Sequence, residues 1–145
     1  MNTNLLELLN KEVANLGVLY IKLHNYHWFV KGNNFYTLHE KFEEIYDETT
    51  AHLDEIAERL VMLNYKPAAS LKEFLELTSL KEATGNESEV EMVNSIINDL
   101  KVIDQEFAKG IELADEANDD VSADMITGIR ASLQKHIWML TAFLG

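Results

Sequence analysis

The sequence predicts an all-α protein, a four-helix bundle, and three observations support this. One proline and six glycines in 145 residues leave few positions that would break a helix. Apolar residues recur at steps of three and four over four long segments. Hydrophobic residues make up 47% of the chain, which is enough for one core, so we expect a single domain over residues 1–145.

Turn signals separate the four segments. Gly32 suits the C-terminal end of a helix, and Pro67 prevents the second helix from continuing. The expected helices run from about Asn4 to Val30, from Phe35 to Asn64, from Glu89 to Ala117, and from the turn at Asn118-Asp119-Asp120 to Phe143. The inward stripe expected along the last helix is Val121, Met125, Ile129, Leu133, Ile137, Leu140 and Leu144.

The connection between the second and third helices differs from the other two. It is about two dozen residues long, whereas the others are short. Ser70 and Glu73 stand in it at capping-box spacing, which predicts a short extra helix between Ser70 and Thr78. Short links favour antiparallel neighbours, and one long link permits a crossover. This pattern is typical of a ferritin-like four-helix bundle.

Composition excludes several function classes. The formal net charge of −13 disfavours nucleic-acid binding, which needs Lys and Arg against phosphates, and it attracts cations instead. The absence of cysteine excludes disulfides, zinc–thiolate sites and thiol catalysis, and it fits a reducing cytoplasm. We see no signal peptide and no apolar run long enough to span a bilayer, so we expect a cytoplasmic protein with no membrane partner.

The expected second helix carries ligand-type residues beside its apolar stripe. His39 and Glu43 are four residues apart, and so are Asp54 and Glu58, so each pair meets on the helix surface. Imidazole with carboxylate suits ferrous iron, zinc or manganese. The alternative is that Asp54 and Glu58 are solvated charges and that His39 packs or caps.

One helix cannot bring the two pairs to the same metal. His39 and Asp54 are 15 residues apart, which is about 22 Å along the axis. The pairs His39–Glu58 and Glu43–Asp54 nevertheless share one midpoint, between positions 48 and 49. Two antiparallel copies related by a two-fold axis through that point would place one pair opposite the other and form two identical sites. We therefore hypothesise a metal site shared between two chains.

A further histidine lies near the end of the first helix, in the segment His24-Asn25-Tyr26-His27-Trp28. His27 precedes the turn that leads to His39, so the two imidazoles could converge on one metal. The alternative is a histidine that is satisfied by a backbone carbonyl.

Beyond spacing, the chain resembles a known family over essentially its whole length. The resemblance is carried by KLHNYHWFVKGNNFYTLHEKFEEIYDE, by HLDEIAERL, and by the later segments NDDVSADM and KHIWMLTAFLG. Together they resemble the signature of the Dps family (DNA-binding protein from starved cells), the mini-ferritins. The resemblance implies a hollow dodecamer of tetrahedral symmetry with ferroxidase sites at two-fold interfaces. It also implies hydrogen peroxide as the preferred oxidant.

The resemblance also implies a ligand set. His27 and His39 of one chain would bind iron together with Asp54 and Glu58 of its two-fold partner. Glu43 stands where the family often has Asp, and its longer side chain alters the second iron position. At most two iron ions would occupy each site, and zinc would substitute for iron in crystals.

The resemblance also bears on one tryptophan and on the three histidines that are not predicted ligands. Trp28 matches a tryptophan of the site pattern and would intercept radicals or, alternatively, cover the interface as a large amphipathic ring. His24, His52 and His136 have no ligand role in the family, and we expect them to be packing or surface residues.

The resemblance places the start of the fourth helix at a three-fold pore. Asp119, Asp120 and Asp124 are the candidates to line it, because three copies of an acid around an axis attract cations. The alternative is that Asp119 or Asp120 caps the helix and Asp124 interacts with its dipole.

The predicted function is that of an iron-oxidising, iron-storing protein that protects the cell from oxidative damage. One alternative is a non-enzymatic metal-sequestering cage with a vestigial ferroxidase site. Another is a DNA-condensing protein, which the net charge and the lack of Lys or Arg in the first ten residues disfavour.

Overall fold

The computed structural model describes residues 3–145, and all regular secondary structure in that part of the chain is helical. The helices are α1 (Thr3–Phe29), α2 (Phe35–Met62), α3 (Leu71–Leu77), α4 (Glu89–Glu116) and α5 (Asp120–Leu144). The predicted all-α fold and the extra helix in the crossover are confirmed, and the bounds differ from the expected ones by one or two residues. Ser70 caps α3 as predicted, since its hydroxyl accepts a bond from the Glu73 N–H at 3.2 Å.

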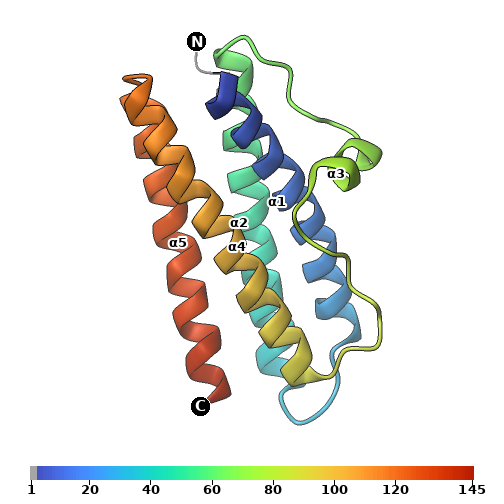
Figure 1. Cartoon of the computed structure of the whole chain (residues 1–145). Coiled ribbons are helices and arrows are strands. Elements are labelled where there is room, and N and C mark those ends of the chain that lie inside the picture. The colour runs from blue at the N-terminus through green and yellow to red at the C-terminus, as the bar shows by residue number, and fades with distance from the viewer. Residues whose placement is uncertain (1–2) are drawn as a thin grey trace.

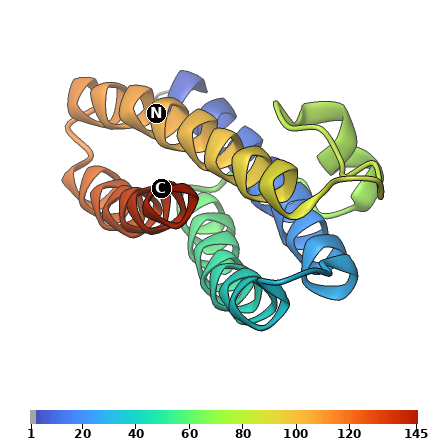
Figure 2. The same ribbon diagram turned by 90° about the horizontal axis from the view of Figure 1, so that it is seen from below.

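The four long helices form two antiparallel pairs, α1 with α2 and α4 with α5, as Figure 1 and the end-on view in Figure 2 show. The crossover runs back along the length of the bundle, so α4 is parallel to α2 (Figure 1). The core between the helices is mainly apolar, and Tyr26, Phe42 and Phe107 are among its largest fully buried side chains. Burial of such side chains is the main stabilising contribution to a bundle of this kind.

The crossover is held against α1 by polar bonds and one close approach. The Asn15 side-chain oxygen accepts bonds from the Thr78 hydroxyl and the Ser79 N–H, both at 2.7 Å. At Gly17 the Phe74 ring lies where a side chain would begin, because a Cβ there would be 2.4 Å from the ring. Glycine at this position lets α3 dock on α1.

The predicted stripe along α5 is wrong in part. Val121 is 63% exposed and Leu144 is 37% exposed. The buried residues of α5 are Ser122, Ile126, Ile129, Leu133, His136 and Leu140. Ser122 faces inward because its hydroxyl accepts a bond from Arg59 of α2 at 2.9 Å, so a polar contact sets the rotation at the start of α5.

Across residues 3–145, no helix combines the length and the apolar character that a bilayer crossing requires.

Candidate metal centre

The turn between α1 and α2 brings two histidines together. Gly32 has a φ of +127°, which side chains other than hydrogen rarely tolerate. Glu89, at the start of α4, accepts bonds from the Asn34 N–H at 3.2 Å and from the Asn34 side-chain amide at 2.9 Å. This tight, tethered turn places His27, in the last turn of α1, beside His39 in the second turn of α2.

His27 and His39 orient each other through their backbones. Nδ1 of His27 lies 2.6 Å from the His39 carbonyl oxygen, and Nδ1 of His39 lies 2.7 Å from the His27 carbonyl oxygen. A carbonyl only accepts, so each Nδ1 carries the proton and each Nε2 keeps its lone pair. The rings stack 3.7 Å apart with their planes inclined by 13°. Both expectations for His27 therefore hold: it is bonded to a carbonyl, and it converges with His39.

Glu43 supplies a third donor from one turn along α2. One of its carboxylate oxygens lies 3.6 Å from Nε2 of His27. The donor atoms of His27, His39 and Glu43 all lie within 4.8 Å of one another. His27 is buried and Glu43 is half exposed, so the cluster sits at the surface with its imidazoles shielded. Two neutral nitrogens and a carboxylate form a donor set that suits a borderline divalent metal.

Asp54 and Glu58 do not join this cluster within one chain. Both are exposed residues on the same helix, further along the surface that carries His39 and Glu43. Ala57 between them is half buried, whereas Val61 beyond them is 60% exposed. A single chain thus assembles three of the five predicted ligands and presents the other two at a distance on an open surface.

Aromatic rings surround the cluster. The Tyr46 ring meets His27 edge-on at 5.3 Å and stacks on His24 at 3.8 Å. Burial, followed by the charges of Glu43 and Asp47, raises the pKa of Tyr46. His24 is a packing residue, as expected. The Trp28 ring meets the His24 ring edge-on at 5.3 Å, and Trp28 is 64% exposed.

At the start of α5, the three candidate pore residues lie in different surroundings. Asp119 caps the helix by accepting the Ser122 N–H bond at 3.0 Å, and it pairs with Arg59 at 2.9 Å. Burial alone would raise the pKa of Asp119, but Ser122 and Arg59 outweigh it and lower the pKa. Asp119 therefore has the alternative capping role. Asp120 and Asp124 are exposed, and their pore role stays a prediction.

Sequence reasoning missed a second group of ligand-type side chains, formed by Glu44 and Glu48 of α2 with His136 of α5. The spacing of Glu44 and Glu48 was visible in the sequence. The approach of His136 was not, because it depends on how α5 rotates against α2.

Comparison with known proteins agrees with the fold. The family model for the ferritin-like domain matches residues 6–145. General stress protein 20U of Bacillus subtilis is 52% identical over 145 residues, the whole of both chains. DNA protection during starvation protein 2 of Bacillus anthracis is 49% identical over 145 residues, all of this chain and 99% of that protein. The chain belongs to the Dps family of ferritin-like proteins.

Solved Dps structures superpose closely on this chain. The crystal structure of a Dps protein from Bacillus brevis covers all of both chains with a TM-score of 0.95 and 50% identity. Dps from Staphylococcus aureus has a TM-score of 0.96 at 43% identity, over 99% of this chain and 97% of that one. Dps from Listeria innocua soaked with zinc has a TM-score of 0.94 at 43% identity, over 97% of this chain and 96% of that one. The predicted family and the ferritin-like fold are thus confirmed.

Proposed function

We propose that this protein is a ferroxidase that oxidises ferrous iron with hydrogen peroxide at sites shared between two chains and stores the ferric product in a hollow dodecamer. The observation that carries the proposal is the His27–His39 pair. Each imidazole is held by a backbone carbonyl so that its Nε2 lone pair is free, and Glu43 adds a carboxylate beside them. Dps from Listeria innocua has been soaked with zinc and with cobalt, and we expect zinc to substitute for iron at this site in crystals.

The remaining ligands would come from a two-fold partner. Asp54 lies about 22 Å along the helix axis from His39, so it cannot reach the same metal within one chain. Both Asp54 and Glu58 are exposed and available to a neighbour. A two-fold axis near the middle of α2 would place them opposite His27 and His39 of the other chain and form two equal sites.

The proposed reaction balances with peroxide as a two-electron oxidant. Two Fe²⁺ ions each lose one electron, the O–O bond of one H2O2 breaks, and two protons complete two water molecules. Anionic oxygen ligands such as Glu43, Asp54 and Glu58 favour the ferric product because Fe³⁺ is a hard cation, and the two imidazoles position the incoming Fe²⁺. The rings of His24 and Tyr46 form a chain of contacts between Trp28 and His27, and Trp28 would intercept radicals there.

A direct assay separates this proposal from a passive cage. Ferrous iron is mixed with peroxide, and ferric formation is followed in the near ultraviolet. We expect the protein to exceed the buffer rate and His27→Ala/His39→Ala to fall to it. His52→Gln serves as a histidine control on α2 outside the cluster and should keep the full rate. A wild-type rate equal to that of buffer would leave the non-enzymatic cage as the function.

Mixed assemblies test whether the site is shared. One chain carries His27→Ala/His39→Ala and the other carries Asp54→Ala/Glu58→Ala, and each is inactive alone. In a mixed two-fold pair, one site has both histidines and both partner carboxylates, and the other site lacks all four. Random pairing makes about half the pairs mixed, so about a quarter of wild-type activity should return. Should no activity return from mixtures shown by mass spectrometry to be mixed, the shared site is wrong.

DNA association is a separate question, since several relatives are named DNA protection during starvation proteins. With a net charge of −13, we propose that this chain makes no tight DNA complex at physiological salt. A gel shift at low protein concentration that weakens with added salt would contradict this.

A further inference from the structure

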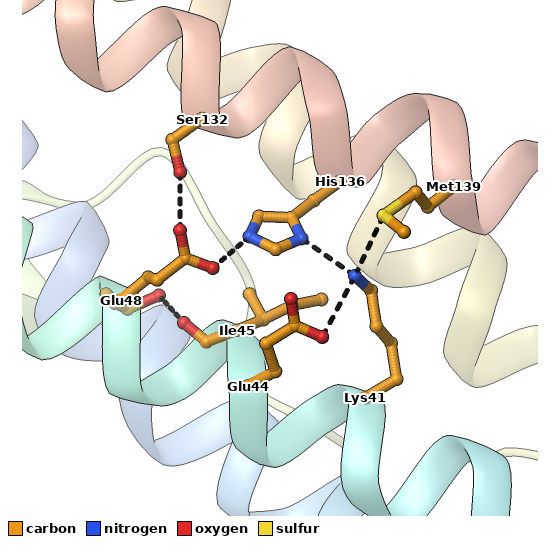
Figure 3. A network of polar contacts seen from close by, with 8 residues as sticks. Lys41, Glu44, Ile45, Glu48, Ser132, His136 and Met139 are labelled. Atoms are coloured by element: carbon orange, nitrogen blue, oxygen red, sulfur yellow. Dashed lines mark hydrogen bonds and ion pairs between the residues drawn. The ribbon is translucent and has the colours of Figure 1, made fainter.

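A second polar network joins α2 to α5 (Figure 3). His136 of α5 lies at its middle and is only 3% exposed. One ring nitrogen, Nε2, contacts Glu48, and the other, Nδ1, faces the Lys41 amine. Glu44 is the next residue after Glu43, so the two side chains leave the helix about 100° apart. The two sites therefore share a helix but no ligand.

The protonation of the His136 ring follows from its neighbours. Ser132 donates its hydroxyl to Glu48 at 2.9 Å. The Lys41 ammonium can only donate, and it lies 3.0 Å from His136 Nδ1, so Nδ1 keeps a lone pair. The proton of the ring is therefore on Nε2, which faces Glu48. This carboxylate–imidazole arrangement is the one that orients histidine ligands in metal sites.

Three acceptors converge on the position of the Lys41 ammonium. Its Nζ lies 3.0 Å from His136 Nδ1, 3.3 Å from a Glu44 oxygen and 3.4 Å from the Met139 sulfur, as the dashed lines in Figure 3 show. The Lys41 side chain is only 13% exposed. Imidazole nitrogen, carboxylate oxygen and thioether sulfur together form a donor set for a borderline transition metal, whereas an ammonium ion gains little from the sulfur.

We propose that this cluster is a second metal site, in which a divalent transition-metal ion such as Co²⁺ or Zn²⁺ replaces the Lys41 ammonium and binds His136 Nδ1, Glu44 and Met139. Lysine is the displaceable cation because its flexible stem can carry the ammonium out to solvent. Metal–nitrogen and metal–oxygen bonds are about 2.0–2.2 Å, so the ligands must close by about 1 Å. Glu44 and Met139 are exposed and unbranched enough to move, while Glu48 holds His136 in place.

Co²⁺ is the probe, because its visible absorption reports ligand geometry and its anomalous scattering reports position. The measurements use the assembled His27→Ala/His39→Ala protein, so that metal at the proposed ferroxidase pair does not contribute and failure here leaves that proposal unaffected. In this background, Lys41→Leu removes the resident cation without adding a donor. It should bind Co²⁺ roughly tenfold more tightly, with an anomalous peak between His136 and Glu44.

Glu44→Gln should weaken Co²⁺ binding in the Lys41→Leu background by roughly tenfold, since it removes an anionic ligand from an exposed position that folding does not need. Glu55→Gln is the matched control, an exposed glutamate further along α2, and should leave affinity unchanged. The site is refuted by any of three results: no peak at His136, no gain in affinity from Lys41→Leu, or equal effects of Glu44→Gln and Glu55→Gln.

Discussion

Glu12 of α1 is a fully buried acid, and replacing it with glutamine should stabilise the protein. Its carboxyl accepts the Asn15 side-chain amide at 2.9 Å, and the same amide reaches Glu106 at 3.0 Å. Burial, followed by the neighbouring Glu106, raises the pKa of Glu12 from 4.5 to about 10. Glu12 is therefore neutral in the folded chain at pH 7. Glutamine has the same shape and, like the protonated acid, can donate to Glu106.

The size of the effect follows from proton linkage. At pH 7 the unfolded chain has an ionised Glu12 with a pKa of 4.5, whereas the folded chain must keep the proton. Keeping the proton at pH 7, which is 2.5 units above the unfolded pKa, costs about 3 kcal/mol at 1.36 kcal/mol per unit. This cost does not depend on the folded pKa value, as long as that value exceeds 7. Because the folded pKa of Glu12 is raised, the free energy of unfolding is unaffected by this cost below pH 4.5 and decreases as pH rises towards 10. Glu12→Gln has no proton to lose at this position, so its stability does not decrease in this way.

Urea unfolding at pH 6, 7 and 8, at one protein concentration, measures this. The free energy of unfolding of Glu12→Gln should exceed that of the wild type by up to about 3 kcal/mol at pH 7, and the gap should widen by about 1.4 kcal/mol per pH unit. Glu7→Gln, an exposed substitution on the same helix, controls for the loss of one negative charge. A gap that is the same at pH 6 and pH 8, or a destabilised variant, would refute the neutral buried acid.

Three further outcomes are expected. Gly32→Ala should lower both stability and the proposed ferroxidase activity, because φ there is +127° and the new Cβ would lie 2.1 Å from a Glu89 oxygen. The unfolding midpoint measures the first effect, and the rate of peroxide-driven iron oxidation measures the second. Asp119→Ala should cost about 1–2 kcal/mol in urea unfolding, since it removes the cap of α5 and an ion pair; an unchanged midpoint would show that the cap is dispensable. Asp120→Asn with Asp124→Asn should slow iron uptake while peroxide chemistry at preloaded sites continues, and equal uptake rates would remove their pore role.

The helices could be predicted because their signals are local. Periodic apolar residues, the Ser70–Glu73 cap and the breaks at Gly32 and Pro67 all act within a few residues of where they stand. The stripe of α5 was predicted less well. Val121 and Ser122 both suit an inward position by spacing, and the hydroxyl contact to Arg59 on another helix selected Ser122.

The residues of the candidate sites also differ in whether they could be predicted from the sequence. The pairs His39–Glu43 and Asp54–Glu58 could be found from four-residue spacing. The Glu44–Glu48–His136 cluster could not, because His136 is 88 residues from Glu48 and nothing local marks it as buried against α2.

By itself, the order of residues determined that this chain forms four long helices, and that one of them carries two pairs of ligand-type residues too far apart for a single metal. Tertiary structure alone decided which nitrogen each imidazole offers, because that choice depends on the acceptor its other nitrogen meets: a backbone carbonyl for His27 and His39, and the Glu48 carboxylate for His136. Spacing along a helix follows from its pitch, whereas the tautomer of a ring follows from neighbours that only folding supplies.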